Sequence, residues 1–286
     1  TVVTRNIHQK SYIIKTQANA GYIEIVEANI FDENKIRKLV QKSHICINLI
    51  GILYEKKGSS FKNIHTKFPS ILSKLCKQYN LEHFIHLSAL GINEAFDSNY
   101  AQSKLEGEKN ILKNFPLATI LRPSVVYSVD DKFTTSFMTL LNRLPIFPLY
   151  YGGKTKFAPI HCSDLTDTIH YVISNRIQSN IIECVGPEEI SFKELLEKLL
   201  RLIDKRRILL PFPLVLAKLS AKFFEMLPNP LLTSDQLKLL KYDNIQSGKY
   251  KTNNDLGVPS VRFFEKEVKR YCYMWRDGGQ FSTEKY

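Results

Sequence analysis

A tyrosine and a lysine four residues apart, Tyr100-Ala-Gln-Ser-Lys104, are the pair of side chains in this sequence best suited to move a proton. On a helix, residues at this spacing lie on one face. Tyrosine is a poor acid or base at neutral pH because its pKa is about 10, but a nearby ammonium group favours the phenolate. The pair therefore indicates proton exchange with a carbonyl or hydroxyl group while a hydride moves, and the lysine could also bind a cofactor ribose.

The same spacing occurs a second time, at Tyr150 and Lys154, and in a chain with 14 tyrosines such a match arises easily by chance. The context distinguishes the two pairs. Tyr100 opens a helical pattern shortly after a strand-like run that ends at Ser88. We therefore take Tyr100 and Lys104 as the candidate catalytic pair.

The elements that must position this pair alternate along the first half of the chain. Short runs rich in β-branched residues fall at residues 1–4, 23–26, 45–50, 83–88 and 118–121. Several are apolar almost throughout, as expected for strands that are buried on both faces. Amphipathic helices are predicted between them: one after Asp32, a longer one after Ser60 and one over residues 100–113. This alternation predicts an α/β fold built on a doubly wound parallel sheet.

After residue 145 the alternation fades and helical signals dominate. Ser191 and Glu194 have the spacing of a capping box, and Thr233 and Gln236 have the spacing of a second one. Prolines bracket a further helical stretch over residues 214–226. We expect a sheet domain over residues 1–145, with sheet-associated segments to about residue 185, and a smaller, mainly helical C-terminal cap over residues 186–286.

Composition limits the classes of protein and partner. The 286 residues are 44% hydrophobic and 24% charged, which is typical of a globular protein, and no run approaches the roughly 20 apolar residues of a membrane span. Five scattered cysteines indicate reduced intracellular thiols, and no spacing predicts a metal site. The net charge of +12 favours anionic partners, and the last third holds 16 Lys and Arg against 9 Asp and Glu. Nucleic acid is disfavoured because the basic residues form no tract.

Several motifs occur in the order that is typical of one family. They are His86-Leu-Ser-Ala-Leu-Gly91, Tyr100-x-x-x-Lys104, Leu121-Arg-Pro-Ser-Val-Val-Tyr127 and the segment from Gly153 to Asp164. In these motifs the chain resembles the extended, atypical short-chain dehydrogenases/reductases, which include NAD(P)-dependent epimerases and dehydratases and have a Rossmann-like fold. Asn48-Leu-Ile-Gly-Ile-Leu-Tyr54, Gly186-Pro-Glu188, residues 232–236 and Asp243-Asn244 narrow the resemblance to the nucleotide-binding accessory subunit family of respiratory complex I and its bacterial relatives.

The resemblance implies roles for residues that follow the predicted strands. Tyr100, Lys104 and Ser88 would be catalytic, and Ala89 is the alternative to Ser88 because the register there is ambiguous. The other implied roles concern the dinucleotide: Arg5 beside the adenosine 2′-phosphate, Asn29 and Ile30 beside the adenine, Asn48 and Gly51 along the cofactor, Lys104 at its ribose, and Pro123, Ser124 and Val125 beside the nicotinamide. Arg5 makes NADP(H) the preferred cofactor, with NAD(H) as the alternative.

The chain departs from the family in its phosphate loop. No Gly-x-x-Gly-x-x-Gly or Gly-x-Gly-x-x-Gly segment occurs, and Thr1 matches the start of the family's second strand. The resemblance therefore implies an N-terminally truncated chain that lacks its first, central strand. Residues 1–4 are then expected either to pair directly with residues 45–50 or to leave the position between them unfilled, and we expect the isolated 286-residue chain to bind no dinucleotide.

These features leave three functions open. The leading hypothesis is an NAD(P)-binding protein of the complex I accessory type, in which the nucleotide is structural or regulatory or supports a reductase activity. The first alternative is an active epimerase, dehydratase or reductase that acts on a nucleotide-sugar or another small carbonyl compound through Tyr100 and Lys104. The second alternative is a peripheral assembly protein with a vestigial nucleotide site.

The expected partners and location follow from the same resemblance and from one helical stretch. The partners would be a dinucleotide, subunits of complex I and the anionic surface of the inner membrane. The location would be the bacterial cytoplasm, peripheral on the inner membrane, or the matrix side of the mitochondrial membrane in a eukaryote. The stretch would place Lys218 and Lys222 beside an apolar face, as in an interfacial helix or a docking surface; the alternative is a helix whose apolar face packs on the core. That face comprises Leu214, Leu216, Leu219, Phe223, Phe224 and Leu227.

Overall fold

The computed structural model describes residues 1–225, 230 and 232–281, except for the side chains of Gln9 and Lys10, and in them the expected strands lie in two parallel sheets. The larger sheet has the order β13-β10-β5-β4-β3 within this described part, and its hydrogen-bonded neighbours are all parallel. Its strands are β3 (Ile45–Asn48), β4 (His83–Leu87), β5 (Thr119–Pro123), β10 (Ile181–Cys184) and β13 (Lys251–Thr252). The smaller sheet pairs β1 (Val2–Thr4) with β2 (Ile25–Glu27). The predicted α/β fold is confirmed.

Strand β1 does not pair with β3 among the described residues: its hydrogen-bonded partner is β2, and the partner of β3 is β4. The first alternative for residues 1–4, direct pairing with residues 45–50, is therefore wrong. The side chains of Val2, Val3, Ile47 and Leu49 are all more than a third exposed along these strands. An edge strand with exposed apolar side chains is unusual and is open to pairing with a further strand.

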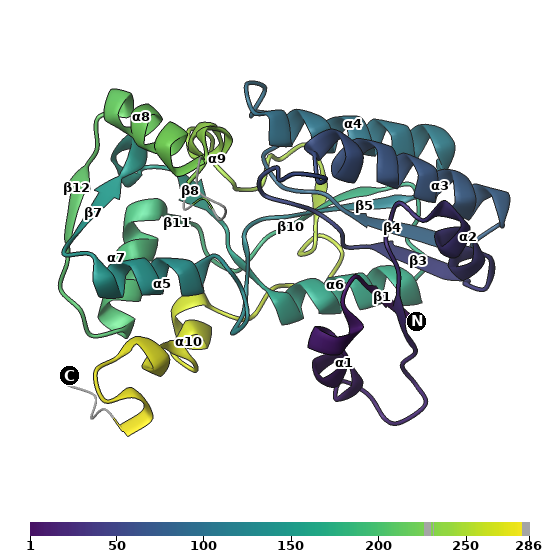
Figure 1. Cartoon of the computed structure of the whole chain (residues 1–286), viewed down its shortest axis with the longest axis horizontal. Helices are drawn as coiled ribbons and strands as arrows, with labels where there is room; N and C mark the ends of the chain where they lie inside the picture. The colour runs from purple at the N-terminus through teal and green to yellow at the C-terminus, as the bar shows by residue number, and fades with distance from the viewer. Residues whose placement is uncertain (226–229, 231, 282–286) are drawn as a thin grey trace.

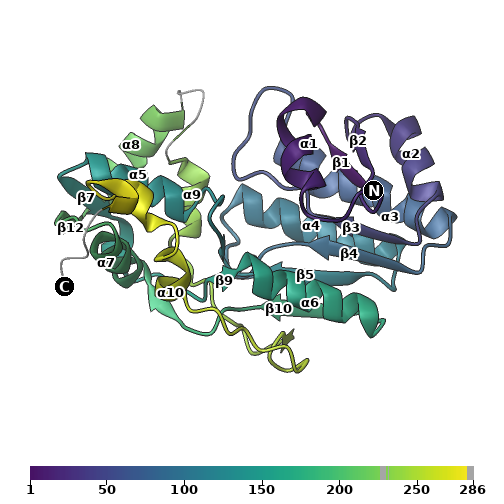
Figure 2. The ribbon, with the colours of Figure 1, turned by 90° about the horizontal axis from the view of Figure 1, so that it is seen from below.

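Helices cover both faces of the larger sheet (Figures 1 and 2). On one face lie α2 (Glu33–Gln41), α3 (Phe68–Gln78) and α4 (Asn99–Asn114), and a π-helical turn, η1 (Lys62–Lys67), runs directly into α3. On the other face lies α6 (Cys162–Ser174), and α1 (Ile7–Lys15) accompanies β1. The predicted N-cap of α2 is confirmed, because the Asp32 carboxylate accepts a hydrogen bond from the backbone N–H of Lys35. We call the two sheets with these helices the sheet lobe.

The rest of the chain forms a second, mainly helical lobe, at the left of Figure 1. Its longer helices are α5 (Thr134–Arg143), α7 (Phe192–Leu202) and α8 (Leu214–Glu225), and its shorter ones are α9 (Ser234–Leu239) and α10 (Phe264–Val268). Three short turns are η2 (Tyr150–Gly153), η3 (Cys272–Trp275) and η4 (Gly279–Phe281). The short strand pairs are β6 (Val126–Tyr127) with β9 (Ile160–His161), β7 (Ile146–Leu149) with β12 (Ile208–Pro211), and β8 (Lys156–Phe157) with β11 (Ile190–Ser191).

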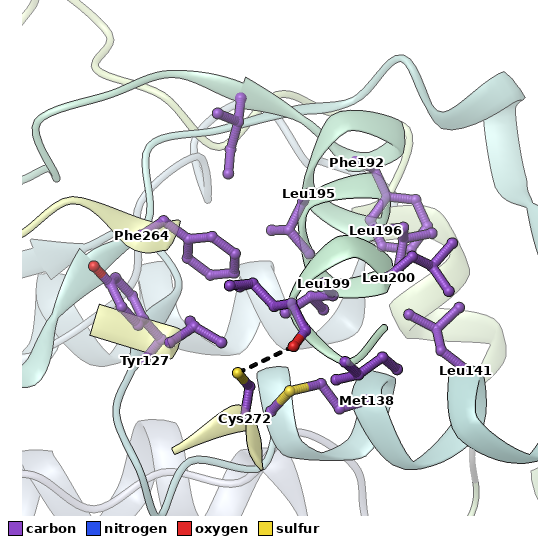
Figure 3. Packing of buried hydrophobic residues seen from close by; sticks show 14 of the residues in the cluster. Tyr127, Met138, Leu141, Phe192, Leu195, Leu196, Leu199, Leu200, Phe264 and Cys272 are labelled. Atoms are coloured by element: carbon purple, nitrogen blue, oxygen red, sulfur yellow. Dashed lines mark hydrogen bonds between the residues drawn. The ribbon is translucent and has the colours of Figure 1, made fainter. Parts of the chain in front are cut away.

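The core of the helical lobe brings together segments that are distant in the sequence (Figure 3). Met138 and Leu141 of α5 pack against Leu195 and Leu199 of α7, and Cys272 donates a hydrogen bond to the carbonyl of Leu202 at 3.3 Å. Residues 134–149 thus belong to this core, whereas β13 returns to the sheet lobe. The predicted division of the chain into a sheet domain over residues 1–145 and a cap over residues 186–286 stays a prediction, because each lobe contains segments from both ranges.

The two capping boxes predicted from the sequence open α7 and α9. The Ser191 hydroxyl accepts from the backbone N–H of Glu194 and the Glu194 carboxylate accepts from that of Ser191, and Thr233 and Gln236 exchange the same two bonds. The helix expected over residues 214–226 is α8, described over Leu214–Glu225, and Met226 lies outside the described residues. No helix in the described ranges is both long enough and apolar enough to cross a membrane.

Candidate functional site

The residues singled out from the sequence lie at the carboxyl ends of the parallel strands. Arg5 follows β1 and is exposed, and Asn29 and Ile30 follow β2, the first exposed and the second buried. At the ends of the next strands are Asn48 and Gly51 (β3), Ser88 and Ala89 (β4), and Pro123, Ser124 and Val125 (β5). In doubly wound sheets, ligands bind beyond this edge. The topology therefore brings these residues to the edge at which such folds bind ligands.

Tyr100 and Lys104 lie on the first two turns of α4, facing the same edge. The Lys104 side chain is buried, and its Nζ donates a hydrogen bond to the carbonyl of Leu87, the last residue of β4, at 3.1 Å. Nζ also lies 6.0 Å from the centre of the Tyr100 ring. Gly51 adds to this arrangement because a Cβ there would be 3.4 Å from Nζ. The helical spacing thus places the ammonium group between α4, β4 and the turn after β3.

Burial sets the protonation of this pair. It raises the pKa of Tyr100 to about 12 and lowers the pKa of Lys104 to about 8, while the Glu108 carboxylate acts on Lys104 in the opposite direction. The Tyr100-x-x-x-Lys104 spacing predicted that the lysine lowers the pKa of the tyrosine, and burial reverses that direction. The Lys104 ammonium lies 6.0 Å from the centre of the Tyr100 ring and donates to the Leu87 carbonyl. Burial of the phenol raises the pKa of Tyr100 by more than the charge of Lys104 lowers it.

His65 is part of this site and was missed in the sequence analysis. Its ring stacks on Phe61 with centroids 5.3 Å apart and meets the Tyr100 ring edge-on at 5.2 Å. Its Nε2 accepts from the Ile52 N–H at 3.0 Å, so Nδ1 carries the proton and donates to Ser103 Oγ at 2.9 Å. Burial and the nearby Lys104 charge lower the pKa of His65 to about 3. The only sequence signal was a histidine one turn after Phe61 within an apolar helical stripe.

A close helix contact holds His65 against α4. A Cβ on Gly107 would lie 2.0 Å from the His65 carbonyl oxygen, so only glycine allows α4 and η1 to approach this closely. The Thr66 hydroxyl donates to the Ser103 carbonyl at 3.1 Å across the same contact. A π-helical turn inserts an extra residue and often occurs at functional sites. Here it carries His65 to the Tyr100 ring.

Two polar atoms, one on β4 and one on the residue that follows it, lie buried at this edge without a partner among the described residues. Among the described residues, neither Ser88 Oγ nor His86 Nε2 has a hydrogen bond, and these residues are 5% and 1% exposed. Asn48 Nδ2 donates to His86 Nδ1 at 3.0 Å, which leaves the His86 proton on Nε2. Asn48 Oδ1 accepts from the Ile50 N–H, so both the nitrogen and the oxygen of the Asn48 amide have a partner within the protein. An unpaired buried hydroxyl is costly in isolation, and it fits a ligand that bonds to it.

A buried ion pair lies one turn beyond Lys104. Arg122 on β5 donates from Nε and Nη2 to the two carboxylate oxygens of Glu108, at 2.9 and 2.6 Å, and both side chains are almost fully buried. The Arg122 guanidinium also lies over the Tyr250 ring at 4.7 Å. This two-bond geometry fixes the rotation of α4 relative to the sheet. The ion pair therefore orients Lys104, one turn earlier on α4, relative to the sheet.

Asn244 binds the segment at which the nicotinamide was expected. Its Oδ1 accepts from Ser124 Oγ at 2.6 Å and from the Val125 N–H at 3.2 Å, and its Nδ2 donates to the Leu90 carbonyl at 2.8 Å. Ser124 is thus held by protein groups, and Pro123 is buried beside it. The side chain of Asn244 joins the ends of β4 and β5 from more than 100 residues away.

The second Tyr-x-x-x-Lys pair lacks the helical geometry that the chemistry requires. Tyr150 is buried in the helical lobe against Ala217, Ala221 and Leu237. Tyr151 and Gly152, which separate it from Lys154, both have positive φ angles, so no helical turn joins the two side chains. A separate pocket of about 180 Å³ lies beyond β10 and does not involve Tyr100 or Lys104. Its lining residues are Ala158, Val185, Gly186, Pro187, Glu188, Glu189, Gln246 and Asn254.

Known protein sequences resemble the chain over most of its length, although no family model matches it. It is 26% identical over 268 residues to mitochondrial NADH dehydrogenase [ubiquinone] 1 alpha subcomplex subunit 9 of Mus musculus, which covers 92% of this chain and 71% of that protein. The Dictyostelium discoideum protein of the same name is 28% identical over 274 residues, covering 94% and 76%. The resemblance to the complex I accessory subunit that the motifs predicted is confirmed.

Solved structures share the fold at low sequence identity. The chain superimposes on the Citrobacter sp. triphenylmethane reductase complexed with NADP(H) with a TM-score of 0.70 at 13% identity, covering 94% of this chain and 89% of that one. For UDP-glucuronic acid 4-epimerase of Bacillus cereus, in complex with UDP-glucuronic acid and NAD, the TM-score is 0.65 at 16% identity, with 92% and 85% covered. These likenesses confirm the Rossmann-like fold of the extended short-chain dehydrogenases/reductases.

Proposed function

We propose that the chain is an NAD(P)-binding protein of the complex I accessory type, with the dinucleotide along the carboxyl edge of β1 to β5. The observation that carries the proposal is the Lys104 ammonium, which lies beside Gly51 and donates to the carbonyl of Leu87, the residue before Ser88, whose hydroxyl has no partner among the described residues. A cationic donor and an unpaired hydroxyl fit the ribose and amide groups of a dinucleotide. The similarity of the chain to subunit 9 of the mitochondrial NADH dehydrogenase, and to solved structures in complex with NAD or NADP(H), supports the proposal.

The protonation state of Tyr100 disfavours the oxidation of a hydroxyl group, which needs a base, and leaves the reduction of a carbonyl group open. A tyrosine whose pKa is raised to about 12 is protonated at neutral pH and is a poor base, so it could only donate a proton. The bound nucleotide would supply hydride chemistry, and this chain would bind and orient it. Lys104 would hold the ribose, and Ser88 would donate to or accept from a substrate oxygen.

An active reductase or epimerase is the second candidate, because Tyr100, Lys104 and Ser88 do converge on one edge. Assays of the protein with NADPH and a panel of nucleotide-sugars and quinones separate the two functions. Turnover that is lost in Tyr100→Phe would favour the enzyme. A protein that binds NADPH without turnover would support the accessory function, and one that binds none would favour the vestigial assembly protein.

Arg5 predicts the choice of nucleotide. Its side chain is exposed at the end of β1, where a guanidinium suits an adenosine 2′-phosphate. We expect NADPH to bind about 10- to 100-fold more tightly than NADH, since a charge-assisted contact contributes about 1.5–3 kcal/mol. Fluorescence titration of the protein expressed from its complete gene measures both affinities. The preference should disappear in Arg5→Ala and persist in Arg37→Ala, an exposed arginine on α2; equal affinities in the wild type would contradict the assignment.

The proposed partners are other subunits of the respiratory NADH dehydrogenase and the anionic surface of the membrane that holds it. Helix α8 supports the second partner. Its Val215, Leu219 and Phe223 are 72%, 61% and 65% exposed, and they repeat every four residues, so they form one apolar stripe. Lys218 and Lys222 are exposed beside this stripe. Leu214 and Leu216 are exposed as predicted, Phe224 is only partly exposed, and Leu227 lies outside the described residues.

We expect α8 to bind vesicles of phosphatidylcholine that contain about a quarter phosphatidylglycerol, because each basic residue near such a surface contributes about 1 kcal/mol. Replacing both Lys218 and Lys222 by glutamate should weaken sedimentation with these vesicles more than tenfold, and added salt should weaken it further. The matched control replaces Lys35 and Lys38 of α2, which are also exposed. Binding that is unchanged by the α8 substitutions, or equally weakened by the control, would contradict a membrane face on α8.

The proposed location follows these partners. In a eukaryote it is the matrix side of the inner mitochondrial membrane, consistent with the mitochondrial proteins that the chain resembles. In a bacterium it is the cytoplasmic face of the inner membrane. Affinity purification of the tagged protein from solubilised membranes, with mass spectrometry of the captured subunits, tests the partnership with the NADH dehydrogenase.

A further inference from the structure

One carboxylate of the helical lobe binds the first turn of α4. Asp235, the second residue of α9, accepts from the Asn99 N–H at 2.7 Å through Oδ1. Its Oδ2 accepts from the Tyr100 N–H at 2.9 Å and from Ser98 Oγ at 2.8 Å. These bonds join residues about 135 positions apart, and α9 lies beside the end of α4 that is nearest the helical lobe (Figure 1).

This carboxylate completes a helix cap that the local sequence provides only in part. Ser98 is the N-cap of α4, and its hydroxyl accepts from the Ala101 N–H. The N–H groups of Asn99 and Tyr100 precede the first intrahelical bonds and therefore need outside acceptors. Asp235 supplies both acceptors and also places a negative charge at the positive end of the helix dipole.

The support for Asp235 comes from its own lobe. A capping box starts α9 at Thr233, and Leu237 is buried against Ala217 and Ala221 of α8. Further along, Leu239 and Tyr242 pack against the cluster that contains Ala101 and Tyr100. The helical lobe therefore contributes part of the surroundings of Tyr100 as well as its backbone contact.

We propose that Asp235 is the positioning residue of the candidate site: it fixes Tyr100 relative to Lys104 from the helical lobe. Lys104 has a separate anchor, the Leu87 carbonyl, and Glu108 has another in Arg122. Loss of the Asp235 carboxylate therefore frees the first turn of α4 and leaves the second and third turns held. The Tyr100 ring then loses its fixed place against the edges of the stacked Phe61 and His65 rings, and the ammonium group stays where it is. This inference rests on the proposed function only in taking Tyr100 as the group that meets a substrate.

The test uses the protein labelled with 3-fluorotyrosine, without nucleotide, so that it is independent of dinucleotide binding. The 19F resonance of Tyr100 is assigned from its absence in Tyr100→Phe. In Asp235→Ala we expect this resonance to move or broaden, and the Asn99 and Tyr100 amides to exchange with solvent at least tenfold faster. In Asp235→Asn the carbonyl oxygen of the side chain can still accept, so we expect an intermediate change.

The matched control is Ser191→Ala, which removes the N-cap of α7 in the same lobe without touching α4. We expect it to leave the Tyr100 resonance unchanged. An unchanged resonance in folded Asp235→Ala, or an equal change in Ser191→Ala, would overturn the proposal. If Asp235→Ala does not fold, the comparison of Asp235→Asn with the wild type decides in the same way. A moved resonance in a protein that binds no NADPH would uphold the positioning role and refute the proposed function.

Discussion

Replacing Glu108 by glutamine is expected to destabilise the folded chain by about 3–5 kcal/mol, because it leaves the Arg122 charge buried without its partner. The glutamine keeps the shape of the side chain, so the loss reports the charge pair and not a cavity. Chemical denaturation at pH 7 measures it. Arg122 also contacts the Tyr250 ring, which compensates for only part of a missing carboxylate.

Two further variants test whether the loss of stability comes from the Glu108–Arg122 ion pair. Glu106→Gln removes an exposed carboxylate two residues earlier on α4 and should change the free energy of unfolding by less than about 0.5 kcal/mol. Replacing Glu108 and Arg122 together by leucine and methionine should restore much of the stability, because an apolar pair leaves no buried charge. A Glu108→Gln protein as stable as Glu106→Gln would show that the ion pair does not hold α4 against the sheet.

Replacing Lys104 by methionine is expected to stabilise the folded protein at pH 7 by about 1–3 kcal/mol. Burial lowers the pKa of this lysine from 10.5 to about 8, so the folded state binds its proton less tightly than the unfolded state does. The resulting cost, at most about 3 kcal/mol, is fully present below pH 8 and disappears as the pH rises to 10.5. The lost bond to the Leu87 carbonyl reduces the gain.

Denaturation of the wild type and of Lys104→Met at pH 7 and near pH 10 measures this effect. The difference between them should shrink at the higher pH, because the lysine is then neutral in the folded state and has begun to lose its proton in the unfolded state as well. The control Lys109→Met removes an exposed lysine from the same helix and should be nearly neutral at both pH values. A destabilised Lys104→Met, or a difference that does not depend on pH, would contradict the burial of this charge. A lysine that lowers stability is the pattern expected of a functional residue.

The parts of the fold that depend on local signals were predictable. Apolar runs gave the five strands of the first half to within a few residues, and side-chain caps at Asp32, Ser191 and Thr233 marked three helix starts. The local signals did not predict which segments pack together in each hydrophobic core. Residues 134–149 join the helical lobe and residues 251–252 return to the sheet because of pairings between segments far apart in the sequence.

The candidate site shows the same division between local and distant contacts. The spacing of Tyr100 and Lys104 on one helix was enough to place them together, whereas the partners that hold them come from elsewhere. Among these partners, His65 reaches Tyr100 through a π-helical turn and Asp235 reaches it from another lobe, and no periodicity in the sequence encodes either contact. The direction of the Tyr100 pKa was wrong because it depends on burial, which the motif does not contain.

Titration calorimetry with NADPH, on the protein expressed from its complete gene, decides whether the proposed nucleotide site exists. We expect saturable binding of one dinucleotide per chain, weakened about 10- to 100-fold in Lys104→Met, since that variant loses a charge-assisted bond but stays folded. Absence of binding at about 1 mM NADPH, far above the dissociation constants usual for cofactor sites, would contradict a nucleotide site in this protein. Equal affinities of the wild type and Lys104→Met would contradict its placement at the end of β4.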